Sequence, residues 1–325
     1  MSRVLVTGGV GTIGSAVVRR LLSDSRWEVR VADHREPPQW MREGCEIRTA
    51  DLRRPEAAGA AVHGCSHVIH LAAIVGGIAN FHKLPFTLFE VNNALTGALT
   101  HAAVDHDLER FVYVSSSMVF ERATEFPTTE EHLASCPAPH SAYGFSKLAG
   151  EVYARAAHEE HGLRYTICRP FNAYGPGELP DPDEPGIAHA VPDLIHKALT
   201  GRRPLEIFGS GEQTRTITHV DDIADGIVTA MAAPAGENED FNISASEELT
   251  VAELARIIWE ACGNDPDQFE LAHLPSFAVD VQRRWPSVEK ARRLLGWEAK
   301  IDLRDGIAQT VAWLREQELK GAVSP

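Results

Sequence analysis

The feature that most constrains the fold is a glycine-rich turn near the start of the chain. Residues 3–6 (RVLV) are typical of a buried strand, and residues 15–22 repeat apolar positions as a helix does. Between them, Gly8, Gly11 and Gly14 follow a GxxGxxG spacing. Glycines let the backbone approach a pyrophosphate closely, and a helix N-terminus presents free N–H groups. The unit therefore predicts dinucleotide binding at the first strand of a parallel α/β sheet.

A second strand-like run, residues 28–33, ends in Asp33. A carboxylate at this place accepts hydrogen bonds from the adenosine ribose hydroxyls and repels a 2′-phosphate, so it favours NAD over NADP. Arg35 lies close enough to weaken this preference slightly. The alternative interpretation of Asp33 is an ordinary loop residue without a ligand.

Strand and helix patterns alternate through the first half of the chain. Further strand-like runs lie at residues 45–50, 67–73, 111–114 and 163–169, with a helical segment at 91–106. After residue 172 the alternation loosens, and the Pro-, Asp- and Glu-rich residues 178–186 predict a surface loop. This pattern predicts an α/β fold, a doubly wound parallel sheet with a smaller C-terminal α/β substrate domain. We place the NAD-binding domain at residues 1–172 and the mainly substrate-binding domain at 173–325, with some segments returning to the sheet.

Tyr143 and Lys147 stand four residues apart at the start of a helical pattern. Residues at i and i+4 share one face of a helix. A neighbouring cation favours the charged phenolate, so Lys147 is expected to lower the pKa of Tyr143. A phenolate formed near neutral pH is a general base for an alcohol proton. Without further motifs, the spacing equally fits a half-exposed aromatic residue and a solvated lysine.

The composition excludes several classes of protein. A formal charge of −15 argues against nucleic acid or an anionic membrane surface as the main partner. The five cysteines form no CxxC pair, so the sequence predicts neither a metal site nor a disulfide framework. Without the apolar core of a signal peptide or a run of membrane-span length, we expect a cytoplasmic protein.

Several motifs occur in one order along the chain. They are the glycine turn, Asp33, residues 70–73 (HLAA), the serines at 115–117, residues 143–147 (YGFSK) and residues 169–177 (RPFNAYGPG). This order resembles the extended short-chain dehydrogenase/reductase superfamily, in its NAD-dependent nucleotide-sugar epimerase/dehydratase family. The resemblance covers nearly the whole chain, through residues 287–297 (SVEKARRLLGW). It implies a Rossmann sheet, an NAD cofactor and a nucleotide-diphosphate sugar as substrate.

The resemblance also implies roles for individual residues. Tyr143 would accept the proton, Lys147 would hold the nicotinamide ribose, and Ser116 would be the catalytic hydroxyl, with Ser115 and Ser117 as alternatives. Arg215 would meet the diphosphate, as would Arg283 or Arg284, between which the alignment is open. The implied cofactor-binding residues are Gly8, Gly11, Thr12, Ile13, Gly14, Asp33, Asp51, Leu52, Leu71, Ala72, Ala73, Asn92, Tyr143, Lys147 and Pro170. The implied substrate-binding residues are Val75, Gly76, Ser116, Ser117, Met118, Asn172, His189, Arg215, Arg283 and Arg284.

The residues after Ser116 favour one branch of this family. Related 4,6-dehydratases carry an Asp-Glu pair where this chain has Ser117 and Met118, and decarboxylating relatives carry Glu at Met118. A thioether cannot transfer a proton. We therefore expect an epimerase that oxidises C4 of the sugar, lets the 4-keto sugar turn over, and returns the hydride to the other face.

Three further functions remain open beside C4 epimerisation. Residues 72–78 and 189–197 resemble GDP-fucose synthase, and related GDP-mannose 3,5-epimerases share the first loop. Both use a cysteine as an acid/base where Met118 stands. His189 would match the second acid/base of the fucose synthase. The synthase consumes NADPH, however, and Asp33 argues against NADPH. A nucleotide-sugar dehydratase or decarboxylase is the second function, and a non-catalytic dinucleotide sensor is the third. The helix at residues 94–106 and the helix that bears Tyr143 are candidates for a two-fold homodimer interface.

Overall fold

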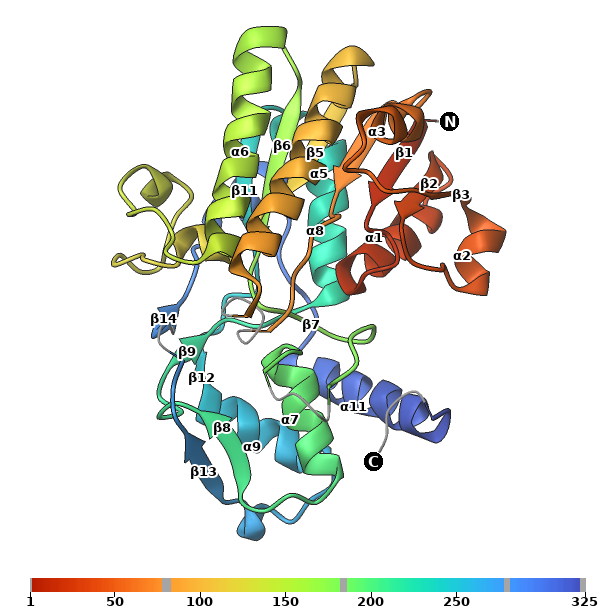
Figure 1. The fold of residues 1–325 in the computed structure, drawn as a ribbon. Helices are drawn as coiled ribbons and strands as arrows, with labels where there is room; N and C mark the ends of the chain where they lie inside the picture. Colours follow the sequence, from red (N-terminus) through yellow and green to blue (C-terminus); the bar gives the residue numbers. More distant parts are fainter. Residues whose placement is uncertain (1, 78–82, 182–185, 278–280, 322–325) are drawn as a thin grey trace.

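The computed structural model describes residues 2–77, 83–181, 186–277 and 281–321 of the 325-residue chain. Within these ranges, its larger lobe holds a seven-stranded parallel sheet in the order β11–β6–β5–β4–β1–β2–β3 (Figure 1). The strands are β1 Ser2–Thr7, β2 Trp27–Asp33, β3 Glu46–Thr49, β4 His67–His70, β5 Arg110–Val114, β6 Tyr165–Pro170 and β11 Glu239–Ile243. The doubly wound α/β fold expected from the sequence is confirmed.

Helices cover both faces of the sheet because successive strand residues point to opposite sides. Val4 and Val6 belong to a core shared with α1 (Thr12–Leu22) and α8 (Val220–Ala232). On the other face, Leu5 belongs to a core shared with three helices, α3 Pro55–Val62, α5 Pro85–Asp105 and α6 Ala142–His161. Burial on both faces explains why β1 reads as a continuous apolar run rather than an alternating one.

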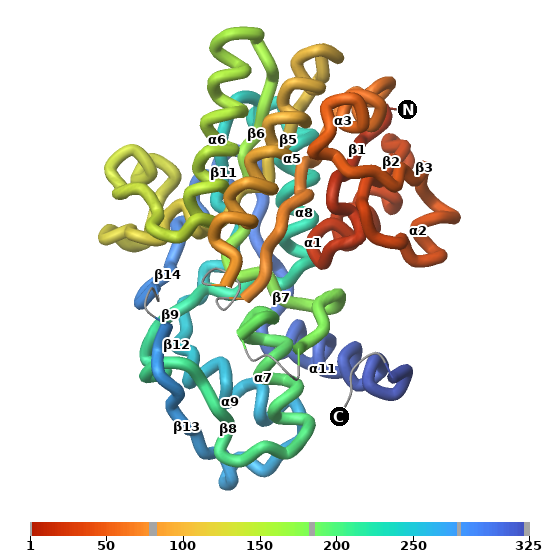
Figure 2. The backbone as a smooth tube through the Cα atoms, viewed as in Figure 1, coloured from red at the N-terminus to blue at the C-terminus, as the bar shows by residue number. Residues whose placement is uncertain are grey.

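A smaller lobe lies beyond the carboxyl ends of the strands, as the tube in Figure 2 shows. Its helices α7 (Ala190–Leu199), α9 (Val251–Ala261) and α11 (Leu303–Leu319) share one apolar core with Leu205 and Ile207. Short strands complete it: β8 Leu205–Phe208 with β13 Leu271–Leu274, β7 Ala173–Tyr174 with β10 Thr218–His219, and β9 Thr214–Arg215 between β12 Leu249–Thr250 and β14 Arg283–Arg284. The remaining helices are α2 Gln39–Gly44, α10 Glu289–Leu295, η1 Ser117–Phe120, η2 Glu131–Ala134, η3 Pro234–Gly236 and η4 Pro266–Gln268.

The chain passes between the lobes more than once. After building α7, β8 and β9 of the smaller lobe, it returns to the sheet as α8 and then β11. In β11, Phe241 pairs with Cys168 of β6, so this late segment forms an edge of the parallel sheet. The sequence analysis did not identify this strand, because its residues EDFNI begin with two acids rather than an apolar run.

A buried ion cluster fastens α6 to the sheet. Arg169 of β6 is fully buried and donates to Glu151 of α6, through Nε at 2.8 Å and Nη2 at 2.6 Å. Arg169 also donates to Asp240 of β11 at 2.7 Å, and Ser115 Oγ donates to Glu151 at 2.7 Å. Burial alone would lower the pKa of Arg169, but the two carboxylates outweigh it and raise that pKa.

Among the helices that the structure describes, none combines the length and the apolar character that a bilayer crossing requires.

Candidate active site

A large cavity opens at the carboxyl ends of the parallel strands, between the two lobes. Residues that directly follow strands line it, including Gly8 after β1, Leu71 after β4 and Ser115 after β5. Its volume is about 1290 Å³. Pockets for one small ligand span roughly 300–1,000 Å³. The cavity is therefore large enough for a dinucleotide and a second ligand, at the edge where open α/β sheets bind their ligands.

The glycine turn has the backbone that a pyrophosphate site needs. Gly8 adopts φ +70°, a left-handed conformation that favours glycine. A Cβ added to Gly14 would lie 2.2 Å from the carbonyl oxygen of Gly8, so only glycine allows the turn to fold so tightly. The α1 N-cap, Gly11, has no side-chain cap, which leaves the first helical N–H groups facing the cavity for an anionic group.

Asp33 lies beside this turn with its carboxylate held by the backbone. Its oxygens accept from the N–H groups of Val10 and Arg35, each at 3.0 Å. Burial raises the pKa of Asp33, but the hydrogen bonds from Arg35 and Val10 and the Arg35 charge outweigh burial and lower it. The carboxylate is thus ionised and lines the cavity, as an acceptor for ribose hydroxyls requires.

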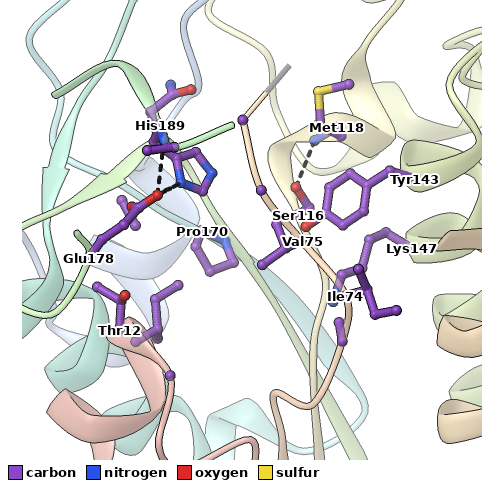
Figure 3. A pocket seen from close by; sticks show the side chains of 18 of the residues that line it. Thr12, Ile74, Val75, Ser116, Met118, Tyr143, Lys147, Pro170, Glu178 and His189 are labelled. Carbon is purple, nitrogen blue, oxygen red and sulfur yellow. Dashed lines mark hydrogen bonds and ion pairs between the residues drawn. The ribbon is translucent and has the colours of Figure 1, made fainter. Parts of the chain in front are cut away.

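Tyr143, Lys147 and Ser116 meet at the wall of the cavity (Figure 3). Ser141 caps α6 by accepting from the Gly144 N–H at 3.0 Å, which places Tyr143 and Lys147 in the first two turns. Lys147 Nζ donates to the carbonyl of Val114 at 2.9 Å, next to the β5 end that carries Ser116. A hydrogen bond with Ser116 also acts on the Tyr143 phenol.

The pKa of Tyr143 differs from the expectation. Burial raises it to about 12, against smaller lowering effects from the Ser116 hydrogen bond and the Arg284 charge. The groups that lower it most are Ser116 and Arg284 rather than Lys147. The ammonium group instead binds the Val114 carbonyl and lies 5.5 Å from the centre of the Tyr113 ring, while burial lowers its own pKa to about 8. In this structure Tyr143 is therefore a protonated phenol at neutral pH.

Arg284, not Arg283, reaches the cavity. Arg284 donates to Asn172 Oδ1 at 3.0 Å and approaches the Met118 sulfur at 2.9 Å. Asn172 is fixed in turn by donating to the Thr216 carbonyl at 2.7 Å. Arg283 forms two 2.8 Å hydrogen bonds with Glu248 and does not line the cavity, so the prediction that it binds substrate is corrected. Adjacent residues of a strand point to opposite sides, which separates the two arginines.

His189 and Glu178 form a pair on another wall of the cavity. Glu178 Oε1 accepts from the His189 backbone N–H at 2.9 Å and lies 2.8 Å from Nδ1 of the ring. Sequence reasoning missed Glu178, because residues 178–186 were expected to form a surface loop. The structure places Glu178 in the cavity instead; residues 182–185 lie outside the described residues.

The other expected ligand-binding residues divide into two groups. Asn92 does not line the cavity: its amide bonds both backbone groups of Ile74 and the Ser146 hydroxyl, so it holds the 74–77 segment in place. In the resembling loop at 72–78, Ile78 lies outside the described residues. The remaining expected residues that line the cavity are Gly8, Gly11, Thr12, Ile13, Gly14, Asp51, Leu52, Leu71, Ala72, Ala73, Val75, Gly76, Ser117, Met118, Pro170 and Arg215.

Part of the cavity wall is apolar, and the sequence analysis did not predict it. Ile207 and Phe208 of β8 contribute to it, together with Leu254 of α9 and Phe277. Ile207 and Phe208 are positioned by pairing of β8 with β13, two strands that lie far apart in the chain and have no common sequence signature. Among the described residues, no group of three or more His, Cys, Asp or Glu side chains is arranged to hold a metal ion.

Comparisons with known proteins agree with this architecture. Residues 4–244 match the model of the NAD dependent epimerase/dehydratase family. The UDP-glucose 4-epimerase of Mycolicibacterium smegmatis is 32% identical over 323 residues, 97% of this chain and 99% of that protein. GDP-L-fucose synthase 1 of Arabidopsis thaliana is 28% identical, over 96% of this chain and 93% of that protein. The structure of UDP-glucose 4-epimerase with UDP-glucose from Thermotoga maritima superposes with a TM-score of 0.86 at 30% identity, covering 97% of this chain and 99% of that one.

Proposed function

This chain belongs to the NAD-dependent epimerase/dehydratase family, and we propose that it epimerises a nucleotide-diphosphate sugar at C4 through a transient 4-keto sugar. Its cofactor is NAD. When bound, NAD accepts a hydride from the sugar carbon and returns it. The glycine turn, Asp33 and Lys147 would hold the cofactor, since they line one continuous cavity with the uncapped α1 N-terminus.

Tyr143 would move the proton of the C4 hydroxyl. A protonated phenol cannot accept a proton, so this role requires the phenolate form of Tyr143, which takes that proton as the alcohol is oxidised and gives it back to the ketone oxygen when the hydride returns. A positive charge near a phenol lowers its pKa, as Arg284 already does here. The Ser116 hydroxyl, hydrogen-bonded with Tyr143, would orient the same sugar oxygen.

The observation that carries the proposal is the pair of side chains beside Ser116. Elimination of water from the keto sugar needs an acid and a base, which Ser117 and Met118 do not supply at these positions. Met118 is buried and its sulfur faces the Arg284 guanidinium at 2.9 Å. Because Tyr143 is then the group that transfers the proton, the simplest reaction returns the hydride to the opposite face of C4.

The direct test is incubation of the purified enzyme with separate UDP-, GDP-, TDP- and ADP-hexoses, followed by NMR of the products. We expect the C4 epimer of at least one sugar, formed without net release of NADH. UDP-glucose is the first probe, since similar proteins carry that sugar nucleotide in their names. A deoxy-keto product or released CO₂ would contradict C4 epimerisation.

A second candidate is an epimerase/reductase of GDP-4-keto sugars. His189 at the start of α7 favours it, because a proton-transferring group on a second wall would suit exchange next to the keto carbon. Met118 argues against it, since this position holds a thioether in place of the thiol that would complete the pair of acid/base groups. Consumption of one reduced cofactor per product would identify this reaction, because simple epimerisation consumes none.

We also propose a homodimer formed by α5 and α6. Their shared surface exposes Phe89, Phe145, Val152 and Tyr153, with 38%, 44%, 58% and 42% exposure. Phe89 and Phe145 lie with ring centres 6.0 Å apart, so the apolar surface is continuous across the two helices. Exposed apolar patches of this kind mark protein interfaces.

Val152→Asp would place a charge in the middle of this interface. We expect size-exclusion chromatography with light scattering to show the mass of two chains for the native protein and of one for the variant. Leu319→Asp is the matched control, because Leu319 is also an exposed apolar residue but lies on α11. A native protein that is monomeric at micromolar concentration would refute the dimer.

A further inference from the structure

The contacts of His189 leave one side of its ring for a ligand. Glu178 accepts from the backbone N–H of His189 and lies 2.8 and 3.0 Å from ring Nδ1 through its two oxygens. Nδ1 and the backbone are thus both tied to one carboxylate, which fixes the rotation of the ring. In the described part of the chain, Nε2 has no protein hydrogen-bond partner. The side chain is 43% exposed, and it lines the cavity.

Three charged groups face or flank His189. Burial alone would lower the pKa of His189, but the charge of Glu178 and the hydrogen bond with it outweigh burial and raise the pKa. Arg284 on β14 opposes this effect. On α7 itself, Asp193 is engaged by Lys197 at 2.9 Å. His189 is therefore a cation at pH values below its raised pKa.

The tautomer of neutral His189 is also decided by Glu178. An ionised carboxylate accepts only, so Nδ1 keeps its hydrogen as long as Glu178 is charged. When His189 loses a proton, that proton must leave Nε2. Deprotonation thus turns Nε2 from a donor into an acceptor, and the cavity loses a donor without any movement of the ring.

Two observations place His189 in the same cavity as the cofactor-binding turn and Tyr143. Gly177, next to Glu178, accepts from the Thr12 hydroxyl at 3.1 Å, so the pair lies beside the cofactor-binding turn. Arg284 also acts on the pKa of both Tyr143 and His189, so its guanidinium lies within electrostatic reach of both walls. Figure 3 shows Tyr143 and Lys147 on one side of the cavity and Glu178 and His189 on the other.

We propose that Glu178 is a positioning residue that fixes His189 so that its Nε2–H donates a hydrogen bond to an oxygen of the substrate's sugar. This inference rests on the proposed function and adds a recognition contact on the wall opposite Tyr143. The acceptor is a neutral oxygen of the sugar. It is one that the sugar ring directs towards His189 when C4 of the sugar faces Tyr143. Binding of the sugar then depends on pH through His189.

The expected pH dependence appears in KM for UDP-glucose. KM is low while His189 is a cation and rises about tenfold or more as pH increases through the raised pKa, since a lost charge-assisted hydrogen bond has that effect. In Glu178→Gln the rise begins at lower pH, because the opposite charge that raises the His189 pKa is gone. His189→Lys keeps a cation to higher pH and flattens the profile. Glu212→Gln, an exposed carboxylate outside the cavity, keeps the native profile.

Two further measurements separate this role from a structural one. The affinity for UDP alone, measured by calorimetry, is expected to lack the His189-dependent change, because UDP has no hexose. Nitrogen NMR of the His189 ring reports the pKa of His189 directly. If Glu178→Gln folds poorly, Glu178→Asp replaces it and is expected to keep the native pKa of His189. Identical KM profiles in the native protein and Glu178→Gln, or the same pH change for UDP, would overturn the proposal.

The outcomes also distinguish this inference from the proposed reaction. C4 epimerisation with a KM that does not respond to His189 contradicts the role of the pair alone. Binding of UDP-glucose with the expected pH course, but without a C4 epimer among the products, contradicts the proposed reaction and leaves the contact standing.

Discussion

Replacing Tyr143 with phenylalanine is expected to lower kcat for C4 epimerisation by a factor of about 10² to 10⁴, the range that one positioned proton-transfer group supplies. The substitution removes a single oxygen from a buried ring, and the Ser141 cap that starts α6 is untouched. NAD affinity should change little, because the glycine turn and Asp33 lie on other elements. Steady-state kinetics and calorimetry with NAD would measure the two effects separately.

Tyr153→Phe is the matched control for this experiment. It removes the same oxygen from a tyrosine of the same helix, but Tyr153 is 42% exposed and does not line the cavity. Its kcat is expected to equal that of the native enzyme. Near-native kcat in Tyr143→Phe would refute the assignment of proton transfer to Tyr143.

The second large effect concerns stability and is expected for Arg169→Met. This change leaves Glu151 and Asp240, both held by Arg169 in the native protein, without the fully buried cation that they share. Removing one partner from a buried ion cluster destabilises a protein by about 3–5 kcal/mol. Urea unfolding followed by circular dichroism should show a clearly lower midpoint than for the native chain.

Arg304→Met provides the comparison, because Arg304 pairs with Glu260 on the surface, where its side chain is 66% exposed. Exposed pairs contribute little, so the midpoint of this variant should stay close to the native value. Equal midpoints for the Arg169 and Arg304 variants would show that the buried cluster does not hold α6 and β11 to the sheet. Arg155 also pairs with Glu151 and Asp240, and Lys290 pairs with Asp240, so these remaining cations reduce the loss of stability.

The sheet could be predicted because its strands are local signals. β1 and β5 each contain a short apolar run, and buried parallel strands have this pattern whatever their neighbours are. The first glycine turn was identifiable for the same reason, since Gly8 and Gly14 are needed by the turn itself. The fold class therefore followed from segments of fewer than ten residues.

The walls of the cavity could not be predicted equally well, because they depend on contacts between distant segments. The sequence did not distinguish Arg283 from Arg284, and only the pairing of β14 with β9 turns Arg284 inward. The contact of Glu178 with His189 joins residues on either side of a loop whose composition indicated surface. The pKa of Tyr143 depends first on burial of its ring, and the hydrogen bond of Lys147 to the Val114 carbonyl is a tertiary contact.

The late position of α8 and β11 has a consequence for synthesis of the chain. As the polypeptide leaves the ribosome, the first six strands are available once residue 170 has emerged, but α8 and β11 follow only at residues 220–243. Until then β6 is an open edge, and the apolar face later covered by α8 is exposed to water. The nucleotide-binding sheet therefore cannot close as an N-terminal unit during translation. A nascent chain halted near residue 172 should therefore bind chaperones or aggregate. The exposed edge and face are covered only when α8 and β11 have been translated, after α7, β8 and β9 of the smaller lobe.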